Sequence, residues 1–473
     1  MSSGDIIVNF FLRLKYYLRA EPFEVNSQEG RTQERHRQML LTTLSSGGAK
    51  ILSIIITLAI VPLTLTYLGV ERYGLWMTIS SAVAMLGFSD LGVGSGLMNA
   101  VADAYGKNDS KDIKAKIAVG ILFLSVIATL ILLIFFIINP YVAWAQLLNV
   151  KSQIAVKEVA PTIAVIVVFF ALSIPAGISL KIQMGLQMGF WANLWLAAGS
   201  IVGVAAVLCV IFLEGGLPYL AAASASPPVI TGILAGIYFF SKQQPLLRPN
   251  FRSLKIKDAK DLGGTSGLFL VLQISGLIAF QSDNLIIAHY LGVGAVTVYA
   301  VAFKIFSLPT LMMSLFLNAL WPAYAEANSR GDNKWIYNSF RKSIRYSVII
   351  VLPLSLLLLV VGKWLIVKWV GESIVPTWDL LLGLFCWTVM TIFGGNFAVI
   401  LNGLGIIRFQ VITSVTMAAI NIIVSIWLVQ LIGVSGAVWG SVLSLVLIVY
   451  LPTALFLRNH FKYKLGLDIE NNN

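Results

Sequence analysis

Four ionisable side chains stand inside otherwise apolar stretches of this sequence. They are Lys50, Asp90, Asp283 and Lys304. A charged group in hydrocarbon is costly unless it is paired or hydrated, so such residues are expected along a substrate or ion pathway. We predict that the two lysines bind substrate in a cavity and that the two aspartates serve ion coupling or ion pairing.

Position along the chain predicts how these groups pair. Lys50 and Asp90 lie at similar depth in their stretches, and Asp283 and Lys304 lie on either side of one turn. A cationic cavity attracts a phosphate or pyrophosphate headgroup, toward which lysine acts as a strong point charge. The carboxylates of Asp90 and Asp283 could bind a coupling proton or sodium ion. The structural alternative is that the lysines and aspartates form ion pairs that only hold helices together.

Glycines and prolines indicate where helices pack or bend. Gly92, Gly94 and Gly96 recur at close spacing, which is typical of tight helix packing or of a hinge. Pro175 and Pro309 fall inside apolar stretches, where a proline interrupts the hydrogen bonds of a helix and is expected to border a cavity. For all five residues, packing is the simpler interpretation.

Motifs for catalysis or metal binding do not occur in the sequence. Cys209 and Cys386 lie far apart in apolar stretches, without the Cys and His spacing of a metal site. The sequence has no GxxxxGK[ST], HExxH or GxSxG motif. We therefore predict that the protein is not an enzyme, holds no metal, and needs no cofactor beyond a coupling proton or sodium ion.

Composition places the chain in a membrane. It is 58% hydrophobic and 11% charged, whereas soluble domains contain about 25% charged residues. Backbone groups in lipid must be bonded internally, so apolar stretches of this length are helices. The sequence predicts an all-α integral membrane protein with about twelve transmembrane helices. The expected spans are residues 40–66, 74–101, 117–139, 158–180, 189–213, 217–240, 263–288, 295–321, 346–370, 377–401, 409–431 and 435–457.

The basic residues support this arrangement of spans. With both termini cytoplasmic, about 26 of the 33 Lys and Arg residues fall on the cytoplasmic side and about five outside. The same bias accounts for the net charge of +12, so we predict no nucleic-acid partner. The outer loops are short and leave no room for an extramembrane catalytic domain.

The two halves of the chain resemble each other. The sequence YLGV at 67–70 recurs at 290–293, about 223 residues later, and further similarities follow at nearly the same offset. Six spans in each half give both halves the same orientation, as in many secondary transporters. We predict two pseudo-symmetric six-helix lobes and this division of the chain: a cytoplasmic tail at 1–39, an N-lobe at 40–240, a basic cytoplasmic connector at 241–262, a C-lobe at 263–457 and a cytoplasmic tail at 458–473. Residues 1–39 are expected to contain an amphipathic helix on the membrane surface or, as the alternative, to form an irregular tail.

Several stretches carry a resemblance to a known family. They are YLGVERYGLW at 67–76, SDLGVG at 89–94, Asp283-Asn284 before the second YLG, LNGLG at 401–405 and GVSGA at 433–437. In these the chain resembles the Wzx-like O-antigen and polysaccharide-unit flippases of the multidrug/oligosaccharidyl-lipid/polysaccharide (MOP) exporter superfamily. The resemblance implies a V-shaped pair of six-helix lobes in a bacterial inner membrane. It also implies a cationic cavity, which maps onto Lys50 and Lys304.

The function that this resemblance implies is translocation of a polyprenyl-pyrophosphate-linked oligosaccharide by alternating access, for surface polysaccharide such as lipopolysaccharide O-antigen or exopolysaccharide. The partners expected with it are the lipid-linked substrate, membrane lipids and polysaccharide polymerase or export proteins. One alternative is a cation-coupled multidrug exporter of the same superfamily, in which carboxylates rather than lysines would face the substrate. Another is a membrane protein that assists polysaccharide assembly without transporting anything.

Overall fold

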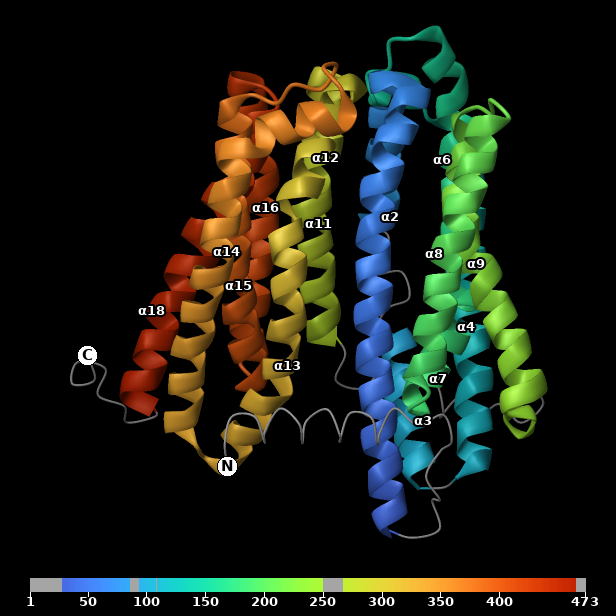
Figure 1. The fold of residues 1–473 in the computed structure, drawn as a ribbon, viewed down its shortest axis with the longest axis vertical. Helices are drawn as coiled ribbons and strands as arrows, with labels where there is room; N and C mark the ends of the chain where they lie inside the picture. The colour runs from blue at the N-terminus through green and yellow to red at the C-terminus, as the bar shows by residue number, and fades with distance from the viewer. Residues whose placement is uncertain (1–27, 86–92, 108, 250–266, 465–473) are drawn as a thin grey trace, which may run out of the picture. The chain divides into compact units, whose positions relative to one another are not determined.

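The computed structural model describes residues 28–85, 93–107, 109–249 and 267–464. Nearly all of these residues are helical, and no β-strand occurs among them (Figure 1). An all-helical chain follows from its composition, because only a helix satisfies the backbone of a single apolar segment in lipid. The predicted all-α membrane fold is therefore confirmed.

Ten described helices are long and apolar enough to cross a membrane, and an eleventh span is obtained if one bent pair is joined. That pair is α12 (Val293–Phe306) with the start of α13 (Leu308–Arg330), bent by 41°. The expected second span, 74–101, runs from the end of α2 (Gln28–Ala84) through residues outside the described ranges into α3 (Val93–Gly106). This division of one expected span explains why the count falls short of about twelve.

The chain forms two compact units, and each is considered by itself. Unit 1 consists of residues 1–60, 89–141 and 164–264. Its described elements are α2 up to residue 60, α3, α4 (Ser110–Ile138), η2 (Asn139–Tyr141), the second part of α6 (Gln153–Ala176), α7 (Ile178–Gly185), α8 (Gly189–Phe212), α9 (Leu217–Tyr238), η3 (Phe239–Gln243) and η4 (Pro245–Leu247). Helix α3 packs against α4 and α7, and its Leu97 and Val101 are fully buried in the core of the unit.

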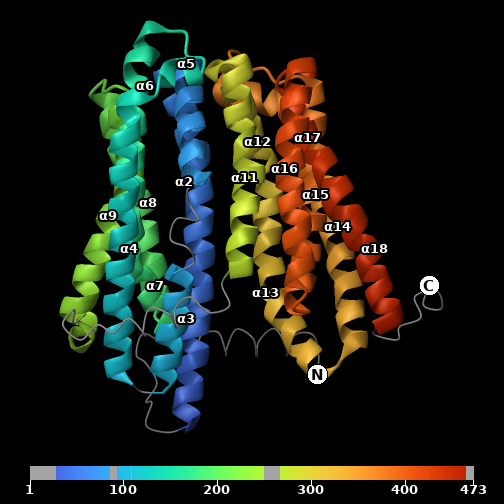
Figure 2. The ribbon, with the colours of Figure 1, turned by 180° about the vertical axis from the view of Figure 1, so that it is seen from behind.

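Unit 2 consists of residues 61–88, 142–163 and 265–473. Its described elements are the end of α2, α5 (Trp144–Leu147), the start of α6, α11 (Gly267–Leu291), α12, α13, α14 (Asn333–Val370), α15 (Trp378–Gly403), α16 (Ile407–Ile432), α17 (Ser435–Ser444), η6 (Leu445–Tyr450), α18 (Leu451–Asn459) and η7 (His460–Lys464). Helix α16 packs against both α11 and α17, as Figure 2 shows. These limits differ from those of the predicted lobes, whose division at 241–262 stays a prediction.

The internal repeat is visible in the backbone. Gly69 has φ 72° and ψ 172°, and Gly292, in the second copy of YLGV, has φ 89° and ψ 158°. Every other described residue with positive φ, apart from Gly331, also has a counterpart about 220 residues away. These pairs are Asn149 with Gly371, Gln187 with Gly405, and Glu214 with Gly433. Positive-φ turns therefore recur at equivalent places in the two halves of the chain.

Helix starts follow the same repeat. Asp109 caps α4 by accepting hydrogen bonds from the backbone N–H groups of Lys111 and Asp112. Asp332 caps α14 in the same way, accepting from the backbone N–H of Trp335 at 3.0 Å. A capping carboxylate satisfies donors that no helical carbonyl can reach, so it fixes where each helix begins.

Gly69 and Gly48 offer a matched test of this repeated turn. Both are exposed residues of α2 with open space where a side chain would go, but only Gly69 has positive φ. We expect Gly69→Ala to lower the free energy of unfolding by about 1 kcal/mol, because alanine is strained at positive φ. We expect Gly48→Ala to raise it by about 0.5 kcal/mol or more, because alanine favours a helix. Unfolding midpoints in detergent measure both, and equal shifts would contradict the turn.

Candidate substrate and ion-coupling sites

Lys304, on α12, is held by a tyrosine. Its ammonium nitrogen donates to the hydroxyl oxygen of Tyr73 at 2.9 Å and lies 5.5 Å from the centroid of the same ring. Tyr73 is fully buried, whereas Lys304 is half-buried. A lysine keeps N–H donors to spare after one such bond. The group is therefore a fixed cation with hydrogen-bonding capacity left over.

A close approach of α2 and α12 brings Tyr73 to this position. At Gly74 a side chain would collide with the backbone carbonyl of Val293, so only glycine allows the contact. Thr297 donates from its hydroxyl to the carbonyl oxygen of Val70 at 2.5 Å across the same interface. Both contacts lie just beyond Gly69, where α2 changes direction. The turn at Gly69 and the close contact at Gly74 thus bring Tyr73 within reach of Lys304 inside this unit.

Asp283, on α11, is only 3% exposed and lies in a polar cluster. Its carboxylate accepts from the Tyr299 hydroxyl at 2.6 Å and from the Ser441 hydroxyl at 3.2 Å. The Asn421 side-chain nitrogen in turn donates to Ser441 at 2.8 Å. Four helices, α11, α12, α16 and α17, therefore meet at one buried acidic group.

The Asn421 amide satisfies its neighbours when its oxygen and nitrogen are exchanged. When it is turned over, its oxygen accepts from Ser441 at 2.8 Å and its nitrogen donates to the Ala279 carbonyl at 3.3 Å. Ser441 has one hydroxyl proton, so it donates either to a charged Asp283 or to the turned Asn421. In the second case a protonated Asp283 can donate to Ser441. The exchanged oxygen also accepts from the Ser441 backbone N–H at 3.2 Å, so Asn421 stays hydrogen-bonded whether Asp283 is charged or protonated.

The predicted ion pair between Asp283 and Lys304 is wrong. The structure describes both residues and joins each to a different tyrosine, with no salt bridge between them. The reason is the helical rotation of α12. Tyr299 and Lys304 are five residues apart, so their side chains diverge by about 140° around the helix. Tyr299 therefore faces α11, and Lys304 faces α2.

Lys50 lies on α2 in unit 1, where it is half-buried. No side-chain hydrogen bond or ion pair joins it to another described residue. Asp90, its predicted partner, lies outside the described residues, so that pairing stays a prediction. Lys50 and Lys304 belong to different units, and each is described within its own unit.

The predicted glycine and proline sites fall as follows. Gly92 lies outside the described residues, and Gly94 and Gly96 lie in α3, where Gly94 is buried. Pro175 is the second-last residue of α6, two positions before the break at Gly177, and Pro309 lies in the first turn of α13, after the 41° bend. Both prolines therefore adjoin interrupted helices, whereas Pro62 and Pro353 lie inside continuous helical stretches.

Several residues of these sites were not singled out from the sequence. Tyr73, Tyr299, Asn421 and Ser441 complete the two clusters, and all four stand in apolar stretches. A polar group within a span needs a hydrogen-bond partner on a neighbouring helix, and this rule was the available signal for Asn421 and Ser441. For the tyrosines the signal is weaker, because an aromatic ring within a span can also be an ordinary part of the apolar core.

A salt bridge near the ends of these helices was also missed. Arg72 makes two hydrogen bonds of 2.7 Å to the carboxylate of Glu158, at the start of α6. Glu71 accepts from the backbone N–H groups of Lys151 and Ser152 at 2.7 and 2.9 Å. Together these contacts fix the loop before α6 to the same part of α2 that presents Tyr73.

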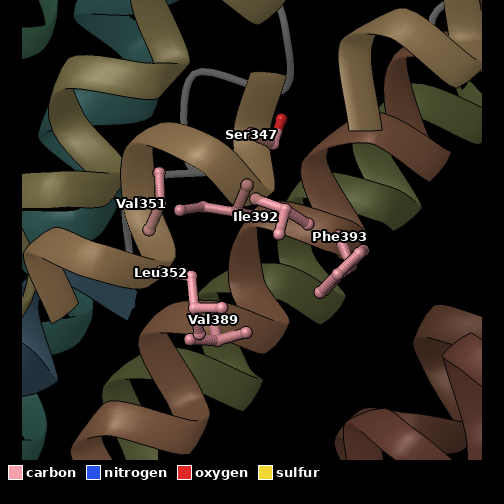
Figure 3. A pocket seen from close by; sticks show the side chains of 7 residues that line it. Ser347, Val351, Leu352, Val389, Ile392 and Phe393 are labelled. Atoms are coloured by element: carbon pink, nitrogen blue, oxygen red, sulfur yellow. The ribbon is translucent and has the colours of Figure 1, made fainter. Parts of the chain in front are cut away.

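An apolar cavity of about 210 Å³ lies between α14 and α15. Figure 3 shows Val351, Leu352, Val389, Ile392 and Phe393 around it. Ser347 is its polar residue, and that hydroxyl already donates to the Ser343 carbonyl and accepts from Asn396. The cavity thus offers nothing that would bind a charged headgroup, unlike the surroundings of Lys304.

Comparison with known proteins identifies the family of this chain. The sequence profile of a family described as polysaccharide biosynthesis protein matches residues 39–328, which is more than half of the chain. The chain belongs to this polysaccharide biosynthesis protein family. The match covers the end of α2, α11 and α12, so both tyrosine clusters draw residues from the family's own region.

Two curated relatives extend the likeness over most of the chain. A protein of Salmonella typhimurium strain LT2 named as an O-antigen transporter is 23% identical, with 87% of this chain and 94% of the relative covered. A Yersinia pseudotuberculosis protein named as an O-antigen export protein is 24% identical, with coverages of 69% and 74%. Both relatives are therefore named as a transporter or an export protein and not as an enzyme.

The fold of this family member is also found among solved structures. A multidrug resistance MATE family transporter of the MOP superfamily, solved in an inward-facing conformation, superposes with a TM-score of 0.72 at 16% identity. The superposition covers 96% of this chain and 99% of the other. At this identity the likeness establishes the fold alone, and the predicted MATE/MOP-like architecture is confirmed.

The buried acidic cluster can be tested through stability. Asp283→Leu leaves Tyr299 and Ser441 without their acceptor, and each single change, Asp283→Leu or Tyr299→Phe, is expected to cost about 1–3 kcal/mol. The double variant should lose about 1–2 kcal/mol less than the sum, because both changes remove the same hydrogen bond. Free energies of unfolding in mixed detergent micelles measure this difference. Strictly additive losses would show that the two residues do not interact.

Proposed function

We propose that this protein is a flippase that moves polyprenyl-pyrophosphate-linked oligosaccharides across the bacterial inner membrane for surface polysaccharide biosynthesis. The observation that carries the proposal is the half-buried cation of Lys304, whose hydrogen-bond partner is a neutral tyrosine and not a carboxylate. Support comes from the polysaccharide biosynthesis family and from relatives named as O-antigen transporters. Both termini are proposed to be cytoplasmic, on the basis of the positive-inside bias.

The chemistry of Lys304 suits a pyrophosphate. A cation without a carboxylate partner retains its full charge for an incoming anion, and the hydroxyl of the buried Tyr73 holds the ammonium group in place. A charge-assisted hydrogen bond of this kind contributes about 1.5–3 kcal/mol. Lys50 supplies a second cation in the first half of the chain, and alternating access presents the bound headgroup to each leaflet in turn.

The multidrug-exporter alternative is not favoured. A cationic drug would need a carboxylate that faces the substrate, but Asp283 is buried and already accepts from Tyr299 and Ser441. That arrangement suits ion coupling better than substrate contact. We assign Asp283 the role of binding a coupling proton, with sodium as the competing ion, because its buried carboxylate has hydroxyl and amide neighbours that can stay hydrogen-bonded in both of its protonation states.

Reconstitution into liposomes tests the proposed function. The purified protein is inserted into vesicles that carry a polyprenyl-pyrophosphate oligosaccharide, and an added glycosidase reports which molecules have reached the outer leaflet. Protein-dependent translocation is expected. Its absence, together with efflux of a cationic dye, would assign the chain to the drug exporters, and absence of both activities would favour an assembly protein that does not transport.

Lys304 and Lys363 form a matched pair for the same assay. Both are half-buried lysines close to an aromatic ring, since Lys363 lies 5.8 Å from the Trp378 ring centroid. Lys304→Ala should slow translocation about ten- to a hundredfold, the loss expected for one charge-assisted hydrogen bond. Lys363→Ala should leave it within about twofold of wild type, as for a surface charge. Equal rates for the two variants would remove Lys304 from the substrate site.

Lys50 and Tyr73 can be tested in the same assay. Lys50→Ala should reduce translocation in the same direction as Lys304→Ala, because each removes one cation that would face the anionic headgroup. Tyr73→Phe keeps the ring and loses the hydroxyl, so a smaller loss of about three- to tenfold is expected for a neutral hydrogen bond. The measurement is the initial rate of translocation as a function of the substrate density in the vesicles. An unchanged rate in Tyr73→Phe would mean that the hydroxyl neither positions the lysine nor contacts the substrate.

A further inference from the structure

A second cavity in unit 2 lies among α11, α15, α16, η6 and α18, with a volume of about 280 Å³. Its lining begins near the end of α15 at Leu401 and the first turn of α16 at Gln410. It continues along α16 to Met417, which is seven residues or about 10 Å of helix further on. No ionisable acid or base other than the Tyr450 phenol lines this cavity.

Polar groups along this lining lack protein partners. The Thr453 side chain is 1% exposed, and its hydroxyl has no hydrogen-bond partner among the described residues. The side-chain oxygen of Gln410 is also buried and unpartnered there. A buried polar group without a partner costs about 1–3 kcal/mol, so these groups call for water. Both residues line the cavity, which is large enough for several water molecules.

On three helical segments, the cavity lining lies close to the acidic cluster of Asp283. The lining includes Ala279 on α11, Met417 on α16 and Leu445 on η6. Four residues from each of these, on the same helix face, stand Asp283, Asn421 and Ser441, the members of the acidic cluster. One helical turn therefore separates the cavity from the carboxylate on all three helices at once.

The local backbone keeps this space open. The segment Leu445–Tyr450 is a π-helix, and the Tyr450 hydroxyl donates to the Met390 carbonyl across the cavity's edge. Gly394 lies against that phenol, where an added side chain would come within 2.7 Å of the hydroxyl oxygen. π-Helical segments are rare and occur often at functional sites. The π-helical segment and the contact of Tyr450 with α15 thus form one edge of the cavity.

From this geometry we infer that the cavity is a water-filled route that carries protons between the aqueous phase near Gln410 and Asp283. The inference rests on the coupling role proposed for Asp283. A hydronium ion delivers its proton to the carboxylate, which leaves water and the neutral acid, and release reverses this step. Of the helices packed against α11, α12 presents Tyr299 as the titratable group in contact with Asp283, whereas α16 and α17 present the non-titrating Asn421 and Ser441.

Thiol labelling tests whether the cavity is wet, independently of transport. Cys209 and Cys386 are first replaced by serine, and Ser414→Cys then places a thiol in the cavity lining. The control is Ile423→Cys, on the same helix but 67% exposed on its outer surface, where lipid is expected. Thiosulfonates react with the thiolate, which forms only where water reaches it.

We expect the small charged reagent 2-sulfonatoethyl methanethiosulfonate to label Ser414→Cys at least tenfold faster than Ile423→Cys, and only from the membrane face that carries Arg408. Equal slow labelling of both thiols would overturn the water-filled route, whether or not the protein proves to be a flippase.

Infrared spectroscopy tests the connection to Asp283. The carboxyl band that disappears in Asp283→Asn is followed after transfer to deuterated water. The double variant Gln410→Leu with Thr453→Val should slow its deuterium exchange at least tenfold, whereas Thr453→Ser, which keeps the hydroxyl, should exchange like wild type. Unchanged exchange in the double variant would show that protons reach Asp283 by another path, even if translocation itself is normal.

Discussion

A charge inside a lipid-spanning helix must be satisfied by the protein itself, and the bond between Lys304 and Tyr73 meets this constraint. Other features of unit 2 follow from it. The turn at Gly69 redirects α2, the missing side chain of Gly74 lets α2 approach α12, and Thr297 fastens the contact through the Val70 carbonyl. Arg72 and Glu71 then fix the neighbouring loop. A neutral partner leaves the lysine charge available, which a carboxylate would have cancelled.

Helix α12 links this cation to the acidic cluster, because it carries both Lys304 and Tyr299. Between them Phe303 stacks on Tyr299 and contacts Trp387 of α15, so the segment is packed on several sides. The backbone turns repeat between the two halves of the chain, but these charges do not. About 223 residues before Asp283 and Lys304 stand Ile60 and Ser81. The repeat therefore supplies a common scaffold, and the second half alone carries this pair of ionisable groups.

The sequence was sufficient for the helical fold, for most spans and for the repeat, because each depends on hydropathy or on backbone turns that local residues dictate. It also placed Lys304 and Asp283 inside spans. It failed on their partners, since position along a span gives depth but not rotation about the helix axis. Because Tyr299 and Lys304 are five positions apart, their side chains point in different directions around the helix, one toward α11 and the other toward α2. Asn421 and Ser441 belong to spans far along the chain, and only tertiary packing shows that they meet Asp283.

The central claim is that the Lys304 cation recognises a pyrophosphate headgroup, and equilibrium binding in lipid nanodiscs tests it most directly. Polyprenyl pyrophosphate and the uncharged polyprenol are compared on wild type and on Lys304→Gln, which keeps a polar side chain without the charge. Wild type should bind the pyrophosphate at least about tenfold more tightly than the alcohol, and the variant should lose most of that preference. A preference that persists unchanged in Lys304→Gln would contradict the account.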